Sequence, residues 1–382
     1  MASTSSKRIA SIDVLRALTM ILMLWVNDFA GMSGIPHWMK HAAMSEDMLG
    51  FSDLIFPTFL FCVGLSIPFA IENRFRKGDS VWKVLLHIIE RSVALLVMGL
   101  FAMNCSGIEG FLPGPWFKIL MVIGFFLIWN NYDAPRKPLA LTLKGIGIAL
   151  LTALVVFRLT HGLPIKAGWW GILGLIGWAY LFSSLIYMLT RRSEIFVCIA
   201  FALVVACVIL CRKELPWLGK LPGGWTHVGL AFGGVLAGTL MKSFKQTGKD
   251  RVFVLSALLL AIICLLAAIF SHRIWIISKI QATPTWMFYS LAISLSLTAL
   301  FYWLTDMKRV DLQRTYLKTA GTATLTCYLL PTIWYAVQQL LGLSWPAALS
   351  AGVPGLCRSM LFAFIIVLIA WLIGKFGIKL KI

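Results

Sequence analysis

The sequence contains few charged residues. Asp, Glu, Lys and Arg make up 13% of its 382 residues, whereas a typical soluble domain carries about 25%. Hydrophobic residues account for 60%, and the mean hydropathy is +0.88. The deficit in charge persists from residue 10 to residue 374. A water-soluble fold cannot bury this much apolar surface, so the composition excludes a soluble globular protein and predicts lipid as the main solvent.

Acidic residues are particularly scarce. There are 15 of them against 34 Lys and Arg, which gives a formal net charge of +19. A strongly basic chain can bind nucleic acid, but here the basic residues form short clusters between long apolar runs. The excess of basic residues in the cytoplasmic loops of membrane proteins explains this pattern better. We therefore expect membrane lipid, and no nucleic acid, as a partner.

Several familiar motifs are missing. The sequence has no CxxC pair, HExxH, GxSxG or P-loop, and most of its eight cysteines lie inside apolar segments, as small buried hydrophobes do. We find no cluster of metal ligands and expect no metal. The first apolar run, from Ile9, lacks a small-residue cleavage site, so we interpret it as a retained helix. The whole chain, 1–382, is predicted to be one transmembrane domain with short tails at 1–9 and 375–382.

The apolar runs predict the fold. A spanning helix needs about 20 mostly apolar residues. Candidates lie near 10–30, 51–71, 84–104, 116–132, 142–159, 169–190, 194–211, 224–241, 252–270, 284–304, 319–341 and 357–374. The fourth and fifth are short or rich in glycine. The fold class is therefore all-α, a polytopic transmembrane helix bundle of about ten to twelve spans.

The loops predict the orientation. One alternating set of loops and tails carries 22 Lys and Arg, and the opposite set carries 8. By the positive-inside rule the first set is cytoplasmic. This set includes both ends of the chain, so both termini are expected in the cytoplasm.

Polar residues inside a span are costly and need a partner or a function. In the first span, Asp13 and Arg16 are three residues apart, so on a helix they share a face and can pair. The pair is interpreted either as an ion pair that fixes the cytoplasmic end of the helix or as part of a cytoplasmic ligand pocket.

The loop between the first two spans holds the richest set of polar residues. Two histidines, His37 and His41, lie there with carboxyl groups and close to Asn27. A neutral histidine is a natural general base, although a loop histidine can also be merely solvated. Pro57, in the second span, indicates either a plain kink or a break that lines a cavity.

The stretch from Arg8 to Asn73 carries a more specific pattern. It reads Arg-Ile-x-Ser-Ile-Asp-Val-x-Arg, an apolar run to Val26-Asn27, Lys40-His41-Ala, and Asp53-Leu-Ile-Phe-Pro57-x-Phe-Leu-Phe-x-x-Gly64-x-Ser66-Ile. This pattern resembles the heparan-alpha-glucosaminide N-acetyltransferase family, more narrowly the bacterial branch of these transmembrane acyltransferases. A second, weaker likeness is Lys279-Ile-x-x-Thr-Pro-Thr285-Trp286, leading to Tyr302-Trp303-Leu-x-Asp306.

The resemblance implies a function. In that family an acetyl group passes from cytoplasmic acetyl-CoA to an amino sugar across the membrane. It implies that His41 is the catalytic histidine, that Asn27 is the essential asparagine, and that Asp53 and Pro57 are the conserved pair of the next helix. Acetyl-CoA would be the co-substrate, without a metal. This agrees with the loop charges, which independently place Asn27 and His41 at the outer face.

The sequence also departs from the family pattern. The Gln-Arg pair of a middle span is absent around Gly171–Gly174, and the asparagine of a late helix is replaced by Thr322 or Thr324. The loop between Asn27 and His41 is longer than in animal members. These differences leave the acceptor open.

Together these observations predict an acetyl-CoA-dependent N-acetyltransferase. Arg16 or Arg91, with Asp13 beside the former, would hold the acetyl-CoA phosphates by charge-assisted hydrogen bonds.

At the outer face, His41 would deprotonate the acceptor amine, Asn27 would donate to the oxyanion, and Asp53 would orient the imidazole. Direct transfer and an acetyl-His41 intermediate both remain open.

Other functions fit part of the pattern. A secondary transporter of an amino sugar would share the apolar spans and buried charges. An acyltransferase with another glycan acceptor, such as a cell-wall glycan, or a non-catalytic scaffold are further alternatives. We expect a multi-pass protein of the bacterial inner membrane, and its long apolar spans permit a homodimer.

Overall fold

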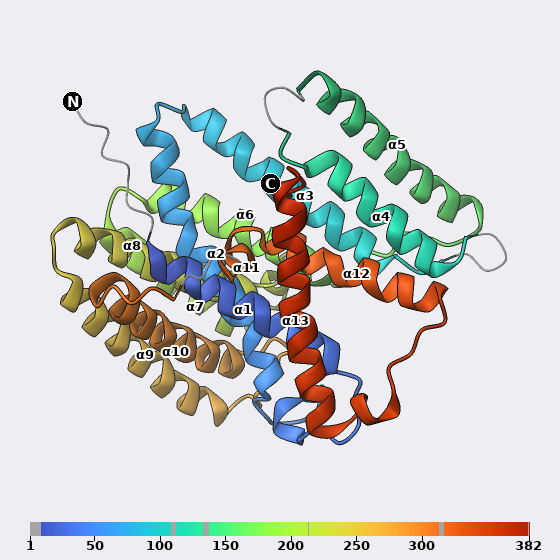
Figure 1. Cartoon of the computed structure of the whole chain (residues 1–382). Coiled ribbons are helices and arrows are strands. Elements are labelled where there is room, and N and C mark those ends of the chain that lie inside the picture. The colour runs from blue at the N-terminus through green and yellow to red at the C-terminus, as the bar shows by residue number, and fades with distance from the viewer. Residues whose placement is uncertain (1–8, 108–111, 133–136, 213, 313–316, 381) are drawn as a thin grey trace.

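The computed structural model describes residues 9–107, 112–132, 137–212, 214–312, 317–380 and 382 (Figure 1). Nearly all of these residues are helical, and only two isolated β-bridges, Ser33 to Ala351 and Asn130 to Leu380, occur among them. The α-helices are α1 (Ala10–Phe29), α2 (Phe51–Arg76), α3 (Val81–Met103), α4 (Gly114–Trp129), α5 (Lys137–Thr160), α6 (Gly171–Thr190), α7 (Glu194–Leu210), α8 (Trp225–Gln246), α9 (Asp250–His272), α10 (Pro284–Phe301), α11 (Leu317–Thr322), α12 (Thr324–Leu340) and α13 (Gly352–Lys375). The shorter elements are the 3-10 helices η1 (His37–Met39), η3 (Pro216–Lys220) and η5 (Ala347–Leu349), and the π-helix η4 (Tyr302–Met307).

Each of the twelve predicted spans corresponds to a helix or to a pair of consecutive helices. Among the described residues, eight helices are long and apolar enough to cross a membrane: α1, α2, α3, α5, α6, α9, α10 together with η4, and α13. α4 and α7 are apolar but shorter. The polytopic helical bundle is thus confirmed. The predicted ten spans are reached if these two shorter helices also cross, and twelve if α8 and α12 cross as well.

α2 and α8 pack closely at the centre of the bundle. A Cβ atom on Gly64 would lie 1.7 Å from the Ala231 carbonyl oxygen, and one on Gly234 would lie 2.1 Å from that of Phe61. Because glycine lacks this atom, the two backbones approach as closely as small-residue interfaces in membranes allow. This close packing makes α2, which carries much of the candidate site, a rigid element.

The helices at the periphery expose apolar side chains. Leu255, Leu259 and Ile262 of α9 are each more than half exposed, as are Leu141 and Ile148 of α5. α4 and α5 form a hairpin at one side of the bundle, and α9 lies beside α10 at the opposite side (Figure 1). These surfaces fit contact with lipid.

Two loops are joined at one end of the bundle. The Asp47 carboxylate accepts the backbone N–H of Ile277 at 2.7 Å and lies 2.8 Å from His272 Nε2. The Gln281 side chain donates to the Met44 carbonyl at 2.9 Å. The loop between α1 and α2 is therefore fixed against the loop between α9 and α10, although more than 220 residues separate them along the chain.

Candidate active site

His41 and Asp53 form a close pair at this end of the bundle. Asp53 lies in the first turn of α2, and its side chain is 3% exposed. Its Oδ1 lies 2.7 Å from His41 Nδ1, and its Oδ2 accepts the backbone N–H of Ala42 at 2.9 Å. Negative charge is also favoured at a helix N-terminus. Two hydrogen bonds and the helix position therefore hold a buried carboxylate against the imidazole.

The contact with Asp53 determines which nitrogen of the His41 imidazole carries the proton. An ionised carboxylate only accepts hydrogen bonds, so the neutral His41 ring carries its proton on Nδ1 and donates it to Asp53. Nε2 is then left with its lone pair, on a side chain that is 36% exposed. Such a nitrogen is able to take a proton from an approaching nucleophile.

Lys279 is the third member of this cluster. It comes from the loop between α9 and α10, and its Nζ lies 3.3 Å from His41 Nδ1 and 3.6 Å from Asp53 Oδ1. Burial lowers the pKa of Lys279, and the neighbouring Asp53 carboxylate opposes this effect. Trp286, at the start of α10, donates from Nε1 to the Asp53 backbone carbonyl at 3.1 Å.

Lys279 was not among the residues to which the sequence assigned a role at the site. Its signal was the second motif, in which Lys279 and Trp286 stand seven residues apart. Both now contact the His41–Asp53 pair. Thr283 fixes where α10 begins relative to the Lys279 loop, because it caps the helix by accepting the backbone N–H of Trp286 at 3.3 Å.

Gly50 allows the His41 segment to approach α2. A Cβ atom at this position would lie 2.2 Å from the Lys40 carbonyl oxygen and 3.0 Å from Asp53 Oδ2. Ser52 then ties the two segments together by donating to the Met39 carbonyl at 2.6 Å. The local sequence thus places His41 directly over the first turn of α2.

Asn27 lies in the last turn of α1, at the same end of the bundle, and is exposed. No hydrogen bond to the His41–Asp53 pair is found for Asn27 in the described part of the chain. Its neighbour Asp28 is buried and binds Tyr335 Oη at 2.7 Å and Arg358 Nη2 at 2.5 Å. The end of α1 is therefore anchored to α12 and α13.

Two other residues that the sequence singled out, His37 and Pro57, are not part of the hydrogen bond between His41 and Asp53. His37 is 67% exposed on its side chain and contacts Glu46 at 3.0 Å, as a solvated loop histidine does. Pro57 is buried inside α2, which continues through it to Arg76. Pro57 therefore does not end α2, but it cannot donate to the Asp53 carbonyl four residues earlier, and Trp286 Nε1 donates to that carbonyl instead at 3.1 Å.

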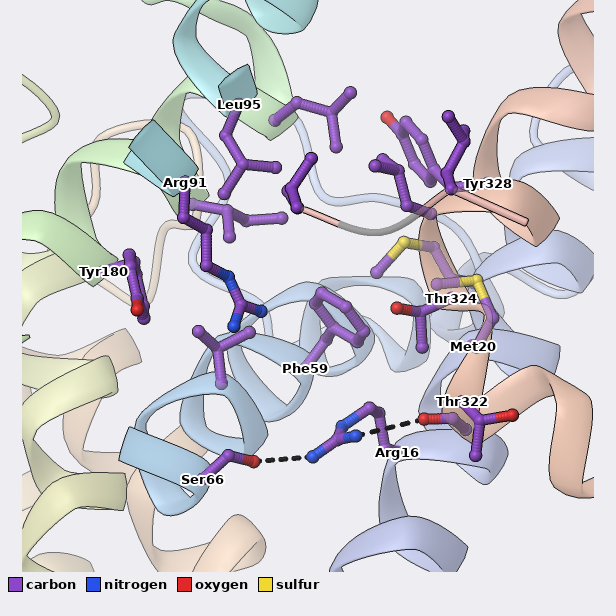
Figure 2. A pocket seen from close by; sticks show the side chains of 18 of the residues that line it. Arg16, Met20, Phe59, Ser66, Arg91, Leu95, Tyr180, Thr322, Thr324 and Tyr328 are labelled. Carbon is purple, nitrogen blue, oxygen red and sulfur yellow. Dashed lines mark hydrogen bonds between the residues drawn. The ribbon is translucent and has the colours of Figure 1, made fainter. Parts of the chain in front are cut away.

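A cavity of about 220 Å³ lies deeper in the bundle, between α1, α2, α3, α6, α11 and α12 (Figure 2). Arg16 enters it from α1, donating to Ser66 Oγ at 2.6 Å and to the Gly321 carbonyl at 3.1 Å. Asp13 Oδ1 lies 3.6 Å from the Arg16 guanidinium. The predicted i,i+3 ion pair is confirmed, and Arg16 lines a pocket as well.

Arg91 enters the same cavity from α3. Its guanidinium lies 4.7 Å from the centre of the Tyr180 ring (Figure 2). Its Nε is buried and has no hydrogen-bond partner among the residues that the structure describes. Buried donors are usually paired, so the described neighbours of Arg91 do not use all of its hydrogen-bonding capacity.

The remaining wall of the cavity is largely apolar. Near Gly171–Gly174, the lining residues are Leu173 and Ile176. Thr322 and Thr324, the two candidates for the missing asparagine, both line the cavity. Residues at the positions singled out in the sequence thus contribute to the wall of one pocket.

The cavity stops short of the imidazole. Its lining includes Met20, Met23 and Phe59 but neither His41 nor Asp53. Phe59 is six residues beyond Asp53, a distance of about 9 Å along a helix. The two methionines are buried, at 1% and 4% exposure, and lie on α1 between Arg16 and the end of the helix.

Residues 8–232, more than half of the chain, match the family described as "Domain of unknown function (DUF5009)". The chain belongs to this family. It is also 32% identical over 117 residues to the heparan-alpha-glucosaminide N-acetyltransferase of Mus musculus, covering 30% of this chain and 17% of the mouse protein. The Homo sapiens protein of the same name is 33% identical over 113 residues, covering 29% and 16%. The matched segment thus spans less than a fifth of either relative, and the relationship is distant.

The DUF5009 region contains most of the site. His41, Asp53, Arg16 and Arg91 all lie within residues 8–232. Lys279 and Trp286 lie beyond that region, as does the wall formed by α11 and α12. In this DUF5009 protein the candidate base and the cavity are therefore completed by the C-terminal part of the chain.

Proposed function

We propose that this protein is a transmembrane acetyltransferase that moves an acetyl group from acetyl-CoA to an amino sugar. One observation carries the proposal: an Asp53-bound His41 with an available Nε2 lies at one end of α2, and a cavity with two guanidinium groups lies further along the same helix. The names of the two distant relatives support acetyl transfer as the reaction.

The proposed orientation follows from the loop charges. The loops and tails with 22 basic residues face the cytoplasm, so α2 begins at the outer face and ends in the cytoplasm at Arg76. The cavity reaches Ser66 and Ala70, in the cytoplasmic half of α2. In this orientation acetyl-CoA enters from the cytoplasm, and the base, His41, lies at the outer face.

The cavity fits part of the donor. Arg16 and Arg91 supply positive charge for phosphate or pyrophosphate oxygens, which guanidinium groups bind well. The apolar wall suits the slender pantetheine arm. However, about 220 Å³ is below the roughly 300–1,000 Å³ of ordinary ligand pockets. The nucleotide end therefore stays near the cytoplasmic surface while the arm enters.

The acetyl group must then pass the methionines. We infer that Met20, Met23 and Phe59, which line the cavity, separate it from His41. Methionine side chains are flexible and adapt to new shapes. Rotation of these three side chains would let the thioester reach the outer half without breaking the close packing of α2 and α8.

The proposed chemistry is a direct acyl transfer. His41 Nε2 takes a proton from the acceptor amine as its nitrogen attacks the thioester carbonyl. The carbon–sulfur bond breaks, and the imidazolium returns the proton to the departing thiolate, giving an amide and CoA thiol. Asp53 holds the ring throughout. Asn27, exposed at the same end, is the proposed donor to the oxyanion and a contact for the acceptor.

Thiol release tests the proposal. Purified protein in detergent is incubated with acetyl-CoA, with and without glucosamine, as wild type, His41→Ala and His161→Ala. His161 is an exposed histidine that follows α5, and it serves as the matched control. We expect glucosamine-stimulated release in wild type and His161→Ala and its loss in folded His41→Ala.

Two outcomes would contradict the proposal. Equal release by His41→Ala would remove the assigned base. No release from folded wild type with a panel of amino sugars would remove the acetyltransferase itself, and uptake of an amino sugar into liposomes would then support a transporter.

A further inference from the structure

The proton balance of the His41–Asp53 pair depends on its surroundings. Asp53 is 3% exposed and lies 2.7 Å from the imidazole. A buried carboxylate without a cation gains from binding a proton, directly or through its neighbour. The nearest cation is Lys279, with Nζ 3.6 Å from Asp53 Oδ1 and 3.3 Å from His41 Nδ1.

The other charged groups near Lys279 have partners of their own. His272, at the end of α9, pairs with Asp47 at 2.8 Å. His227, in the first turn of α8, bonds the Gly223 carbonyl through Nδ1 at 2.7 Å and packs against Trp286. Lys279 is therefore the cation that balances Asp53.

The loop that carries Lys279 is held by contacts that do not use its side chain. The Ala282 carbonyl accepts Arg212 Nη2 at 2.8 Å and Thr226 Oγ1 at 2.7 Å. The Ile277 N–H donates to Asp47 at 2.7 Å. Because these bonds remain when the ammonium group is removed, a variant of Lys279 is expected to keep the loop in place.

We propose that Lys279 is a positioning residue whose positive charge keeps an additional proton off the His41–Asp53 pair and so leaves His41 Nε2 unprotonated. The inference rests on the proposed function for its kinetic consequence, but the state of the imidazole is measurable without turnover.

Proton counting makes the inference specific. If the pair gains one proton, it becomes either an imidazolium beside a carboxylate or a neutral imidazole whose Nδ1 accepts from a carboxylic acid. In both microstates Nε2 carries a hydrogen, so the base is lost whichever way the proton is shared. A fixed positive charge at 3.3 Å disfavours both microstates, since each adds positive charge to the pair.

The first test is labelling by diethyl pyrocarbonate, which modifies unprotonated imidazole nitrogen. Labelling of His41 is followed by peptide mass spectrometry from pH 5 to pH 9 in wild type, Lys279→Met, Lys279→Arg and Lys166→Met. Lys166 is an exposed lysine in another loop at the same end of the bundle, and His161 in each sample is the internal reference.

We expect Lys279→Met to raise the pH at which His41 labelling is half-maximal by about one unit, the size expected for loss of a neighbouring charge. Lys279→Arg, which keeps the charge, and Lys166→Met should superimpose on wild type. An unshifted Lys279→Met curve in protein that elutes and melts like wild type would overturn the inference. If Lys279→Met does not fold, Lys279→Gln replaces it and is judged by the same shift.

The second test separates this inference from the proposed function. In thiol-release assays, the acid limb of kcat/KM in Lys279→Met should move to higher pH by the same amount, with the KM for acetyl-CoA unchanged. A labelling shift in a wild type that releases no thiol would refute the acetyltransferase and leave the role of Lys279 intact. Turnover by the wild type without any labelling shift in Lys279→Met would support the acetyltransferase and refute the role of Lys279.

Discussion

Asp53→Asn is the sharpest perturbation of the proposed site, because it changes the hydrogen-bond pattern and keeps the shape. In the native site, Oδ2 accepts the Ala42 N–H at 2.9 Å and Oδ1 faces His41 Nδ1 at 2.7 Å. The substituted side chain has a single oxygen, which Ala42 needs because a backbone N–H can only donate. The side-chain amide NH2 therefore turns toward His41.

This amide converts the imidazole to the wrong tautomer. With an N–H donor opposite Nδ1, that nitrogen accepts, and the ring proton moves to Nε2, which can no longer act as the base. General-base catalysis contributes roughly 10²–10⁴ in rate, and we expect kcat to fall by that factor. The KM for acetyl-CoA should stay within about threefold, because Asp53 does not line the cavity.

The assay is thiol release across acetyl-CoA concentrations at pH 7, with Ser52→Ala as the control. Ser52 is the neighbouring residue in α2 and bonds the Met39 carbonyl rather than the imidazole, so its loss should affect folding more than kcat. Folding of both variants is checked by thermal unfolding in detergent. An Asp53→Asn enzyme with kcat within about threefold of wild type would refute the tautomer argument.

Three further predictions concern the donor cavity, the His41 segment and the loop contact. Arg91→Met should raise the KM for acetyl-CoA roughly tenfold, the loss of about one charged hydrogen bond, while the thermal midpoint is kept; an unchanged KM would exclude Arg91 from donor binding. Gly50→Ala should lower stability by about 1–3 kcal/mol, because its Cβ would lie 2.2 Å from the Lys40 carbonyl oxygen, and an unchanged melting midpoint would contradict the close approach. The Ile277 N–H holds the pKa of Asp47 below its ordinary value of 3.8. The ionised Asp47 carboxylate therefore stabilises the fold above that value, and this stabilisation is lost as the pH falls through the lower pKa of the folded state. Asp47→Asn should accordingly flatten the melting profile below about pH 4, and a wild-type profile parallel to that of the variant in this range would contradict the prediction.

The helices could be predicted well from the sequence because lipid imposes a simple rule on the chain. Every backbone group inside a bilayer must be bonded within the structure, so a long apolar run forms a helix. The regions of α1, α2 and α9 follow directly from this rule. α8 is less apolar than its neighbours, and two of its glycines, Gly234 and Gly238, are explained by close contact with α2, which hydropathy does not describe.

The candidate site was only partly predictable. His41 and Asp53 are twelve residues apart, and the motif that carries them indicated that they belong together. Lys279 is 238 residues from His41, and its position depends on how two loops pack. A count of charges in the less basic set of loops could not distinguish Lys279 from Lys166 or Lys220, because only tertiary contacts bring one of these lysines to a carboxylate.

The two arginines of the cavity differ in how far their contacts within the protein account for them. Arg16 satisfies much of its hydrogen-bonding capacity with Ser66, Gly321 and Asp13, so it alone is explained as a structural residue. The Arg91 guanidinium lies over the Tyr180 ring, and its buried Nε has no partner among the described residues. A buried donor left unpaired costs about 1–3 kcal/mol. The guanidinium also lines the cavity, and we propose that its other nitrogens bind the phosphates of the donor.

Ligand-induced stabilisation therefore tests the donor site before any turnover is seen. At a CoA concentration of about 100 times its Kd, binding to the folded state alone stabilises the protein by about 2.7 kcal/mol. CoA should thus raise the melting midpoint of the wild type and raise it less in Arg91→Met. Dephospho-CoA or pantetheine, which lack some or all of the phosphates, should be weaker if the guanidinium groups bind phosphate. Equal stabilisation by pantetheine would place the phosphates outside the cavity and assign Arg91 to another anion.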